Sequence, residues 1–235
     1  MKGYCPVGCT YCYARRMYDR YGWNKEIRLD MSALDLSKLK KPSRIFVGST
    51  MELFGTWVPQ EWLHWIFGVV NENPQHTFIF LSKRPGHLHK WSPFPDNCRV
   101  GMTATDDNSY SRAYFTLANF IDAKVKFISL EPFLHQILSG HIESSMKHIN
   151  WLIIGRQTPR SKKTEPELDW MREVVMAADR HGVPVFLKDN LGWPRLSADG
   201  SPPFYRKING TWQLRQEIPK GKEINGKKHC GNGGR

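Results

Sequence analysis

The sequence predicts an α/β protein in the form of a partial (β/α)6-type TIM barrel, and three observations lead to this fold class. Six short runs rich in β-branched and aromatic residues occur within the first 190 residues. Stretches with helical periodicity alternate with these runs, as they do where helices connect parallel strands. Most of the runs are almost continuously apolar, which is typical of strands covered on both faces. A closed barrel of this kind has eight strands, so six strands predict an incomplete one.

The expected strands and helices follow one another along the chain. The strands are expected at residues 44–48, 77–81, 99–102, 126–130, 151–155 and 183–187. A helix is expected at 60–71, because Pro59 precedes apolar residues that recur at intervals of three and four. The stretches 109–121 and 165–181 show the same periodicity, and Gly182 is a typical residue to end the second of them.

The composition changes after Asp189, where Gly, Pro, Lys and Asn become frequent. Residues 205–208 and 211–214 flank Asn209-Gly210, a pair typical of the two-residue turn of a β-hairpin. We therefore expect three segments, which are a barrel-like domain over 1–190, an extension with a hairpin over 191–220, and a flexible basic tail over 221–235.

The overall composition limits the class of protein. Of the 235 residues, 40% are hydrophobic and 24% are charged, which excludes a wholly disordered protein. No apolar run approaches the ~18 residues of a membrane span, and the start is not a signal peptide, so we expect a cytoplasmic protein that does not enter membranes. The 34 Lys and Arg residues exceed the 22 Asp and Glu residues, giving a net charge of +12. That excess favours an anionic partner such as nucleic acid.

Three of the five cysteines, Cys5, Cys9 and Cys12, lie close together near the start of the chain. An odd number of cysteines without an export signal is unsuited to disulfides, and closely spaced thiols in a reducing compartment indicate metal binding. Three thiolates in the pattern C-x3-C-x2-C can hold three corners of a [4Fe–4S] cluster and leave the fourth iron open to a ligand. The alternative is a zinc knuckle completed by a histidine, by Cys98 or by Cys230.

The pattern C-x3-C-x2-C, followed by Tyr13 and then by alternating strands and helices, resembles the radical S-adenosylmethionine (SAM) superfamily. The resemblance implies a radical SAM-like partial barrel, a [4Fe–4S] cluster on the three cysteines, and SAM bound to the open iron. It also implies reductive cleavage of SAM to methionine and a 5′-deoxyadenosyl radical. The electron would come from a reductant of the flavodoxin or ferredoxin type.

A narrower resemblance extends over most of the chain. In order along the sequence, the segments that resemble a phage and bacterial group of unknown function within that superfamily are 8–14, 44–49, 52–54, 74–78, 81–85, 129–133, 151–155 and 185–188, followed by Gly192-Trp193. The group is distantly similar to spore photoproduct lyase, a radical SAM enzyme of DNA repair. The resemblance and the positive charge together predict a nucleic acid or nucleotide as the substrate, and they are compatible with a protein partner.

Ligands of parallel α/β folds bind beyond the carboxyl ends of the strands, so polar residues directly after each strand are candidates for the site. Together with Tyr11 of the cysteine motif, the residues expected to bind the cofactor are Gly48, Ser49, Glu52, Lys83, Thr103, Thr105, Glu131, Gly155 and Lys188. Glu131 is expected to face the SAM amino group and to need a cation nearby, namely Lys83, Arg84 or Lys188. The alternative for Glu131 is a structural ion pair with Lys188. Ser49, Thr105 and Asp106 also resemble helix caps.

The sequence leaves two main functional hypotheses and a third possibility, an accessory protein that keeps the fold and has lost the chemistry. The first is a radical SAM enzyme that carries a [4Fe–4S] cluster on Cys5, Cys9 and Cys12 and acts on a nucleic acid or nucleotide, in repair or modification. The second is a zinc- or cluster-stapled nucleic-acid-binding module without catalysis.

Overall fold

The chain forms one sheet of six parallel strands, as predicted. The computed structural model describes residues 1–191 and 203–219. The strands are β1 (Arg44–Val47), β2 (Thr77–Ser82), β3 (Cys98–Ala104), β4 (Val125–Leu130), β5 (Trp151–Ile154) and β6 (Val185–Leu187). They are hydrogen-bonded in the order of the sequence, β1-β2-β3-β4-β5-β6, and every neighbouring pair is parallel. This arrangement confirms the α/β fold class with six parallel strands.

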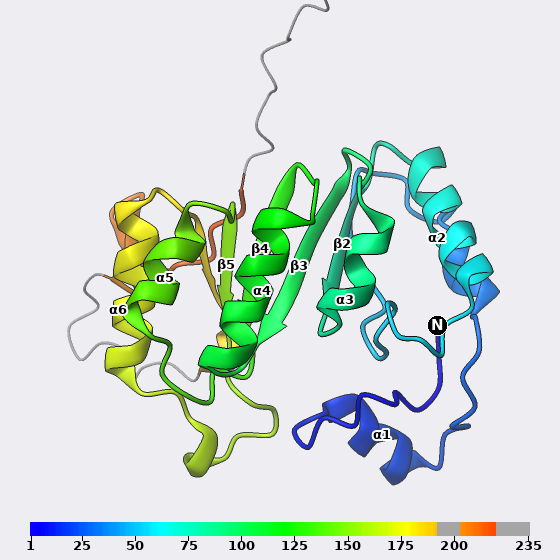
Figure 1. Ribbon diagram of the computed structural model, residues 1–235, viewed down its shortest axis with the longest axis horizontal. Coiled ribbons are helices and arrows are strands. Elements are labelled where there is room, and N and C mark those ends of the chain that lie inside the picture. The colour runs from blue at the N-terminus through cyan, green and yellow to red at the C-terminus, as the bar shows by residue number, and fades with distance from the viewer. Residues whose placement is uncertain (192–202, 220–235) are drawn as a thin grey trace, which may run out of the picture.

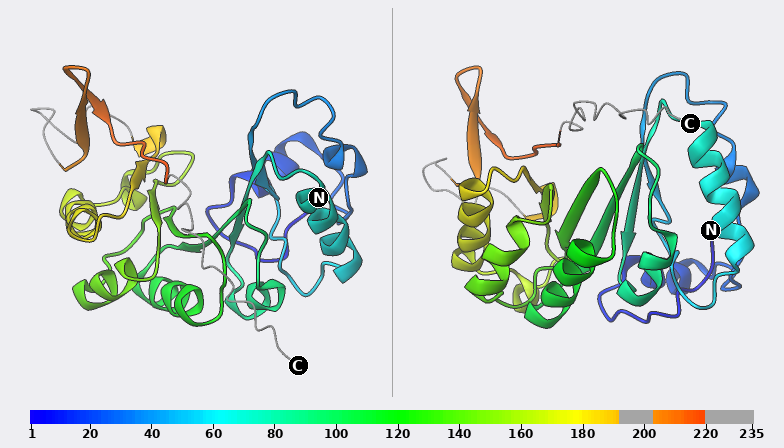
Figure 2. Two further views of the ribbon diagram at one scale, coloured as in Figure 1. Left: turned by 90° about the horizontal axis from the view of Figure 1, so that it is seen from above. Right: turned by 45° about the horizontal axis from the view of Figure 1, so that its top comes forward.

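Helices cover the outer face of this sheet, which curls into a half-barrel (Figure 1, Figure 2). The helices that follow strands are α2 (Gln60–Glu72), α3 (Pro85–Leu88), α4 (Asp107–Asn119), α5 (Ser139–Met146) and α6 (Leu168–Arg180), while α1 (Tyr13–Tyr21) precedes β1. Short 3-10 helices are η1 (Met31–Leu34), η2 (His89–Trp91), η3 (Lys162–Thr164) and η4 (Asp189–Leu191). The inner face of the sheet is concave and carries no helix among the described residues (Figure 2).

Two predicted helix boundaries are wrong by a few residues. The helix expected at 109–121 begins two residues earlier, because the Asp106 carboxylate accepts a hydrogen bond from Ser109 N at 2.8 Å and caps the helix. The helix expected at 165–181 begins at Leu168. A proline disfavours helical backbone angles at the residue before it. Glu165 precedes Pro166 and has an extended backbone with a ψ of 128°, so the helix cannot include it.

Successive residues of a strand point to opposite faces, and this alternation separates two apolar clusters. One set packs beneath the helices in the main core, where Phe80 and Leu152 are fully buried. The other set lines the concave face, where the Phe127 and Trp151 rings lie 5.3 Å apart in a smaller cluster. A Cβ on Gly101 would lie 2.4 Å from the Phe127 ring. The Phe127 ring of β4 therefore covers Gly101 of β3, where there is no room for a side chain.

The predicted antiparallel hairpin is present near the end of the described residues and consists of β7 (Tyr205–Ile208) and β8 (Thr211–Leu214). The two turn residues, Asn209 and Gly210, have positive φ angles of 49° and 82°. Both central residues of this kind of turn need positive φ, which explains why the Asn-Gly pair predicts the hairpin correctly.

A buried arginine fastens the hairpin to the sheet. The Arg215 side chain is 1% exposed and lies 3.0 Å from a Glu217 carboxylate oxygen and 2.9 Å from an Asp179 oxygen of α6. Leu187 N, at the end of β6, donates a hydrogen bond to the Arg215 carbonyl at 2.8 Å. The expected extension is thus packed against the barrel-like domain through β6 and α6.

The predicted tail at 221–235, Cys230 and the Gly192-Trp193 loop lie outside the described residues. Within the part of the chain that the structure describes, no helix combines the length and the apolar composition needed to cross a bilayer.

Candidate functional site at the carboxyl ends of the strands

The three clustered cysteines lie in one loop, residues 5–12, which we call the cysteine loop. Cys12 caps α1, where its Sγ accepts a hydrogen bond from Arg15 N at 3.4 Å. The Arg15 guanidinium reaches back and donates to the Cys5 carbonyl at 2.9 Å. Cys12 N donates to the Cys9 carbonyl at 3.1 Å, and Gly8, which lies between Cys5 and Cys9, has a φ of +71° that turns the chain there. The start of α1 therefore holds both ends of the loop, and all three cysteines are partly exposed free thiols.

The cysteine loop lies at the carboxyl edge of the sheet, beyond the arrowhead of β3 (Figure 1). The Tyr13 hydroxyl donates to the Ser49 carbonyl at 2.8 Å and so joins α1 to the turn after β1. Burial raises the pKa of Tyr13, and the nearby Cys12 and Glu131 raise that pKa further. Burial likewise raises the pKa of Tyr11, with Cys9, Cys12 and Asp106 adding to the effect. The loop therefore faces the residues that follow β3 and β4 as well as β1.

Glu131, Gly155 and Lys188 follow three neighbouring strands and meet at this edge. Lys188 Nζ lies 2.6 Å from Glu131 Oε1, so Lys188 is the cation that Glu131 was expected to need. A Cβ on Gly155 would lie 2.9 Å from that Oε1 and 3.0 Å from Lys188 Cδ, so the glycine leaves room for the pair to span β5. The two side chains keep 25% and 40% of their surface exposed, which leaves the pair accessible to a ligand.

A second polar pair lies on the neighbouring strands β2 and β3. Lys83, directly after β2, donates from Nζ to the Thr103 hydroxyl at 3.1 Å. Thr103 is 7% exposed and belongs to the register that lines the concave face. Lys83 is thus placed by Thr103, and it does not serve as the partner of Glu131.

Glu52 is buried, and its carboxylate ties the turn after β1 to the end of β2. Its Oε1 accepts hydrogen bonds from Phe54 N at 3.0 Å and from the Ser82 hydroxyl at 2.8 Å, and its Oε2 accepts from Lys83 N at 2.7 Å. Both oxygens are therefore engaged within the protein. Glu52 holds the backbone from which the Lys83 side chain extends.

Gly48 and Thr105 also hold loops at this edge. Gly48 has a φ of +75°, and a Cβ there would lie 2.6 Å from Leu53 Cγ, so the turn after β1 requires glycine. The Thr105 hydroxyl donates to the Asp106 carboxylate at 3.0 Å, and the Thr105 carbonyl accepts from Leu134 N at 3.0 Å. The cap-like character of Asp106 is confirmed, whereas Ser49 is no cap and offers its carbonyl to Tyr13.

The three thiols of the cysteine loop are donors that an iron–sulfur cluster or a zinc ion can take. In residues 1–191 and 203–219, no three His, Cys, Asp or Glu side chains are grouped where one metal ion would bind. The ligands of one zinc must converge to about 2.3 Å from a common centre. The thiolates of a cubane bind separate irons, but they too must surround one compact cluster. Three thiols without a histidine or carboxylate are the donors that iron–sulfur clusters take.

The position of Cys98 excludes it as a further ligand of the cysteine loop. Cys98 is the first of the seven residues of β3, so about 20 Å separate it from the carboxyl edge. It is 1% exposed within the main core, and burial raises the pKa of its thiol to about 12. Cys98 therefore behaves as a buried apolar residue.

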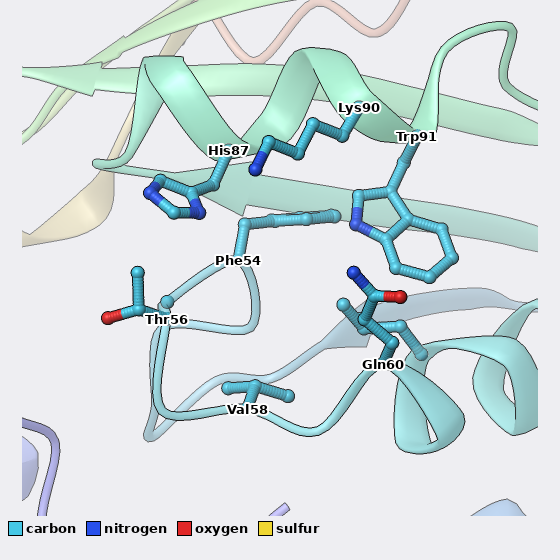
Figure 3. Close-up of a pocket in the computed structure, with 9 residues that line it drawn as sticks. Phe54, Thr56, Val58, Gln60, His87, Lys90 and Trp91 are labelled. Carbon is cyan, nitrogen blue, oxygen red and sulfur yellow. The ribbon is translucent and has the colours of Figure 1, made fainter.

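A pocket of about 200 Å³ lies on the outer side of this edge, between the loop before α2 and the segment from α3 to η2 (Figure 3). His87, Lys90 and Trp91 line it from one side, and Thr56 and Gln60 from the other. No cofactor-binding residue expected from the sequence lines this pocket.

Comparison with known proteins identifies a family for the chain, but it does not identify an activity. The family model described as "Protein of unknown function (DUF5131)" matches residues 4–232. No curated protein matches the chain, and no solved structure does.

Proposed function

The chain belongs to the DUF5131 family, whose function is unknown, and from its own residues we propose that it is a radical SAM enzyme acting on a nucleic acid or nucleotide. The fold alone does not indicate an activity, because proteins with parallel α/β sheets catalyse many unrelated reactions. The proposal therefore depends on the site and not on the fold.

One observation carries the proposal: the cysteine loop is held at the same edge of the half-barrel as the polar residues that follow β1 to β6. The hydrogen bond from Tyr13 to the Ser49 carbonyl, 2.8 Å long, fastens the loop there. Cys5, Cys9 and Cys12 would hold the [4Fe–4S] cluster. With SAM and one electron from a reductant of the flavodoxin or ferredoxin type, such a cluster supplies a 5′-deoxyadenosyl radical that abstracts hydrogen from a substrate.

The residues around the loop match the functional groups of SAM in charge. Glu131 is suited to the amino group and to offsetting the sulfonium charge, and Lys188 is suited to the carboxylate. The two side chains already pair with each other at 2.6 Å, so a zwitterionic ligand can exchange partners with them without leaving a charge unmatched. Thr103 and Lys83 offer a hydroxyl and an ammonium group to ribose oxygens.

The substrate class and the location follow from charge and thiol chemistry. The net charge of +12 favours an anionic substrate such as a nucleic acid or nucleotide. Free thiols that bind a cluster need a reducing compartment, so we propose the cytoplasm. A protein partner that extends the six-stranded half-barrel is compatible with this assignment.

Anaerobic reconstitution tests the proposal. The protein should take up about four irons per chain, turn brown, and form 5′-deoxyadenosine when dithionite and SAM are added. The Cys9→Ala variant should lose both properties, and Cys98→Ala, which removes a thiol from the core, should keep them. Zinc in place of iron in anaerobically purified protein, or cluster loss in Cys98→Ala equal to that in Cys9→Ala, would contradict the proposal.

The second candidate is a nucleic-acid-binding module whose thiols only staple the N-terminal segment. The Glu131–Lys188 pair favours it, because each charge already has a partner without a ligand. This module would bind nucleic acid with a steep salt dependence and would give no heat when titrated with SAM after reconstitution. Binding of SAM in that titration would reject it.

A further inference from the structure

The carboxyl end of α1 carries two exposed aromatic rings that lie face to face. The Tyr21 and Trp23 centroids are 5.5 Å apart with 22° between the ring planes, and the residues are 56% and 43% exposed. Gly22 makes this possible, because its left-handed backbone (φ 62°) ends the helix and folds Trp23 back against it. We call these two rings the Tyr21–Trp23 platform.

Contacts with buried groups hold the platform in place. The Trp23 ring packs edge-on against Tyr18 at 5.4 Å, and Tyr18 is 4% exposed. The Tyr18 hydroxyl accepts a hydrogen bond from Gly3 N at 2.6 Å, and Trp23 N donates to the Tyr18 carbonyl. Rings that are already ordered lose little conformational freedom on binding, so this geometry favours a ligand.

The surface around the platform is basic. Residues 1–28 contain six Lys or Arg and only two acidic residues. Lys2 and Lys25 pair with Asp30 and Asp19 at 2.8 Å and 2.7 Å. In contrast, no acidic side chain of the described residues pairs with Arg16 or Arg20, which lie on α1, the helix that ends at the platform. The Arg20 guanidinium lies over the Tyr21 ring, 5.4 Å from its centroid.

We propose that the Tyr21–Trp23 platform binds single-stranded nucleic acid, with unpaired bases stacked on the two rings and phosphates facing Arg16 and Arg20. Exposed aromatic rings interleaved with unpaired cations are the combination that single strands bind, because every base offers a stacking face and every linkage a negative charge. In a duplex the faces of the bases are covered by their neighbours. The platform therefore selects single-stranded or unpaired nucleotides.

The position of the platform connects it with the cysteine loop. Helix α1 has nine residues, so about 13 Å separate its two ends, and Cys12 caps the end opposite the platform. A strand that is stacked on the platform would reach the cysteine loop within a few nucleotides. This inference deepens the proposed function by naming its substrate as single-stranded nucleic acid, while binding itself requires neither cluster nor SAM.

Fluorescence anisotropy with the full-length protein tests the inference. The probes are labelled single-stranded DNA and RNA of about 12 nucleotides, in the range of known single-strand sites, and the matching DNA duplex. Protein with and without reconstituted cluster is titrated, in each case without SAM. We expect both single strands, or one of them, to bind more tightly than the duplex, and the two arms identify the preferred sugar.

Substitutions locate the binding surface. Tyr21→Ser should weaken binding by about fivefold or more, the lower end of what a stacked base contributes. Trp65→Ala removes a ring that is 52% exposed on α2, a helix without Lys or Arg, and should leave binding unchanged. The double variant Arg16→Gln/Arg20→Gln should make the salt dependence shallower by about 1.4 in log–log slope. The double variant Lys147→Gln/Arg172→Gln, which removes the same charge elsewhere, should not.

Three results would overturn the inference. They are equal affinity for duplex and single strand, equal losses in Tyr21→Ser and Trp65→Ala, or no binding of any oligonucleotide, which would leave a protein surface as the ligand of the platform. Circular dichroism melting of each variant guards against unfolding. Loss of 5′-deoxyadenosine formation with intact binding would instead count against the radical SAM proposal alone.

Discussion

The substitution Glu52→Gln separates a structural role of the Glu52 carboxylate from a ligand role. The wild-type carboxylate accepts three hydrogen bonds, two at Oε1 and one, from Lys83 N, at Oε2. An amide has one oxygen and one NH2 group of nearly the same shape. If the oxygen keeps the bonds from Phe54 N and Ser82, the NH2 group faces Lys83 N–H, and two donors oppose each other. The reverse orientation loses the bond from Phe54 N instead.

The magnitude follows from this geometry. Glu52 is 7% exposed, so water does not replace the lost acceptor freely. A hydrogen bond to a charged group contributes about 1.5–3 kcal/mol, and an unsatisfied buried donor costs about 1–3 kcal/mol. Because these two contributions overlap in part, we expect the free energy of unfolding to fall by about 2–4 kcal/mol. For a chain of this length, that corresponds to a melting temperature lower by about 5–15 °C.

Thermal melting followed by circular dichroism measures the change, and Glu61→Gln is the matched control. Glu61 is an exposed residue in the first turn of α2, so its loss of charge should shift the melting temperature by little. An unchanged melting temperature in Glu52→Gln would refute the structural reasoning. If SAM affinity fell at the same time, the carboxylate would act on the ligand itself.

Three further predictions concern single groups. Glu131→Gln should weaken SAM binding by about 1–3 kcal/mol in calorimetric titration with iron content unchanged, whereas normal binding with a lower melting temperature would favour a purely structural ion pair with Lys188. Native protein should react with iodoacetamide at the thiols of the cysteine loop and not at Cys98, whose buried thiol has its pKa raised to about 12; rapid alkylation of Cys98, read by peptide mass spectrometry, would contradict its burial. Although burial acts to raise it, hydrogen bonds from Arg215 hold the pKa of Glu217 below its ordinary value, so this group stabilises the fold above about pH 4.5 and the contribution is lost as pH falls through the folded-state pKa. The melting temperature should therefore drop more steeply below about pH 4.5 in the wild type than in Glu217→Gln, and parallel curves would refute the linkage.

The strands were predictable because apolar residues occupy both faces of the sheet, in the main core beneath the helices and in the smaller cluster on the concave face, so the apolar runs are nearly continuous in the sequence. The meeting of Glu131 and Lys188 at one edge was predictable for a related reason: residues that directly follow parallel strands share an edge. Helix α5 was not predicted, because Ile142 and Met146 are its only strongly apolar residues. Two such residues are too few to show a helical periodicity.

The partners of individual polar side chains could not be predicted, because they come from distant parts of the chain. Two of the hydrogen bonds that the Glu52 carboxylate accepts come from Ser82 and Lys83, about 30 residues later in the sequence and after α2. The Arg215 guanidinium depends on Asp179 of α6 in the same way. A local pattern contains no information on such contacts. The Tyr21–Trp23 stack depends on the path of the chain after Gly22, and its only trace in the sequence is aromatic residues on either side of a glycine.

The strand order of the sheet has a consequence for the sequence of events during synthesis. Each strand pairs with the strand made just before it, so the sheet can be extended one β/α unit at a time as the chain leaves the ribosome. The cysteine loop is made first, yet its neighbours follow β1, β3 and β4, at Ser49, Asp106 and Glu131. The surroundings of the cysteine loop are therefore complete only after the fourth strand, β4, has been synthesised. Any cofactor loaded onto this loop is enclosed only after more than half of the protein has been made.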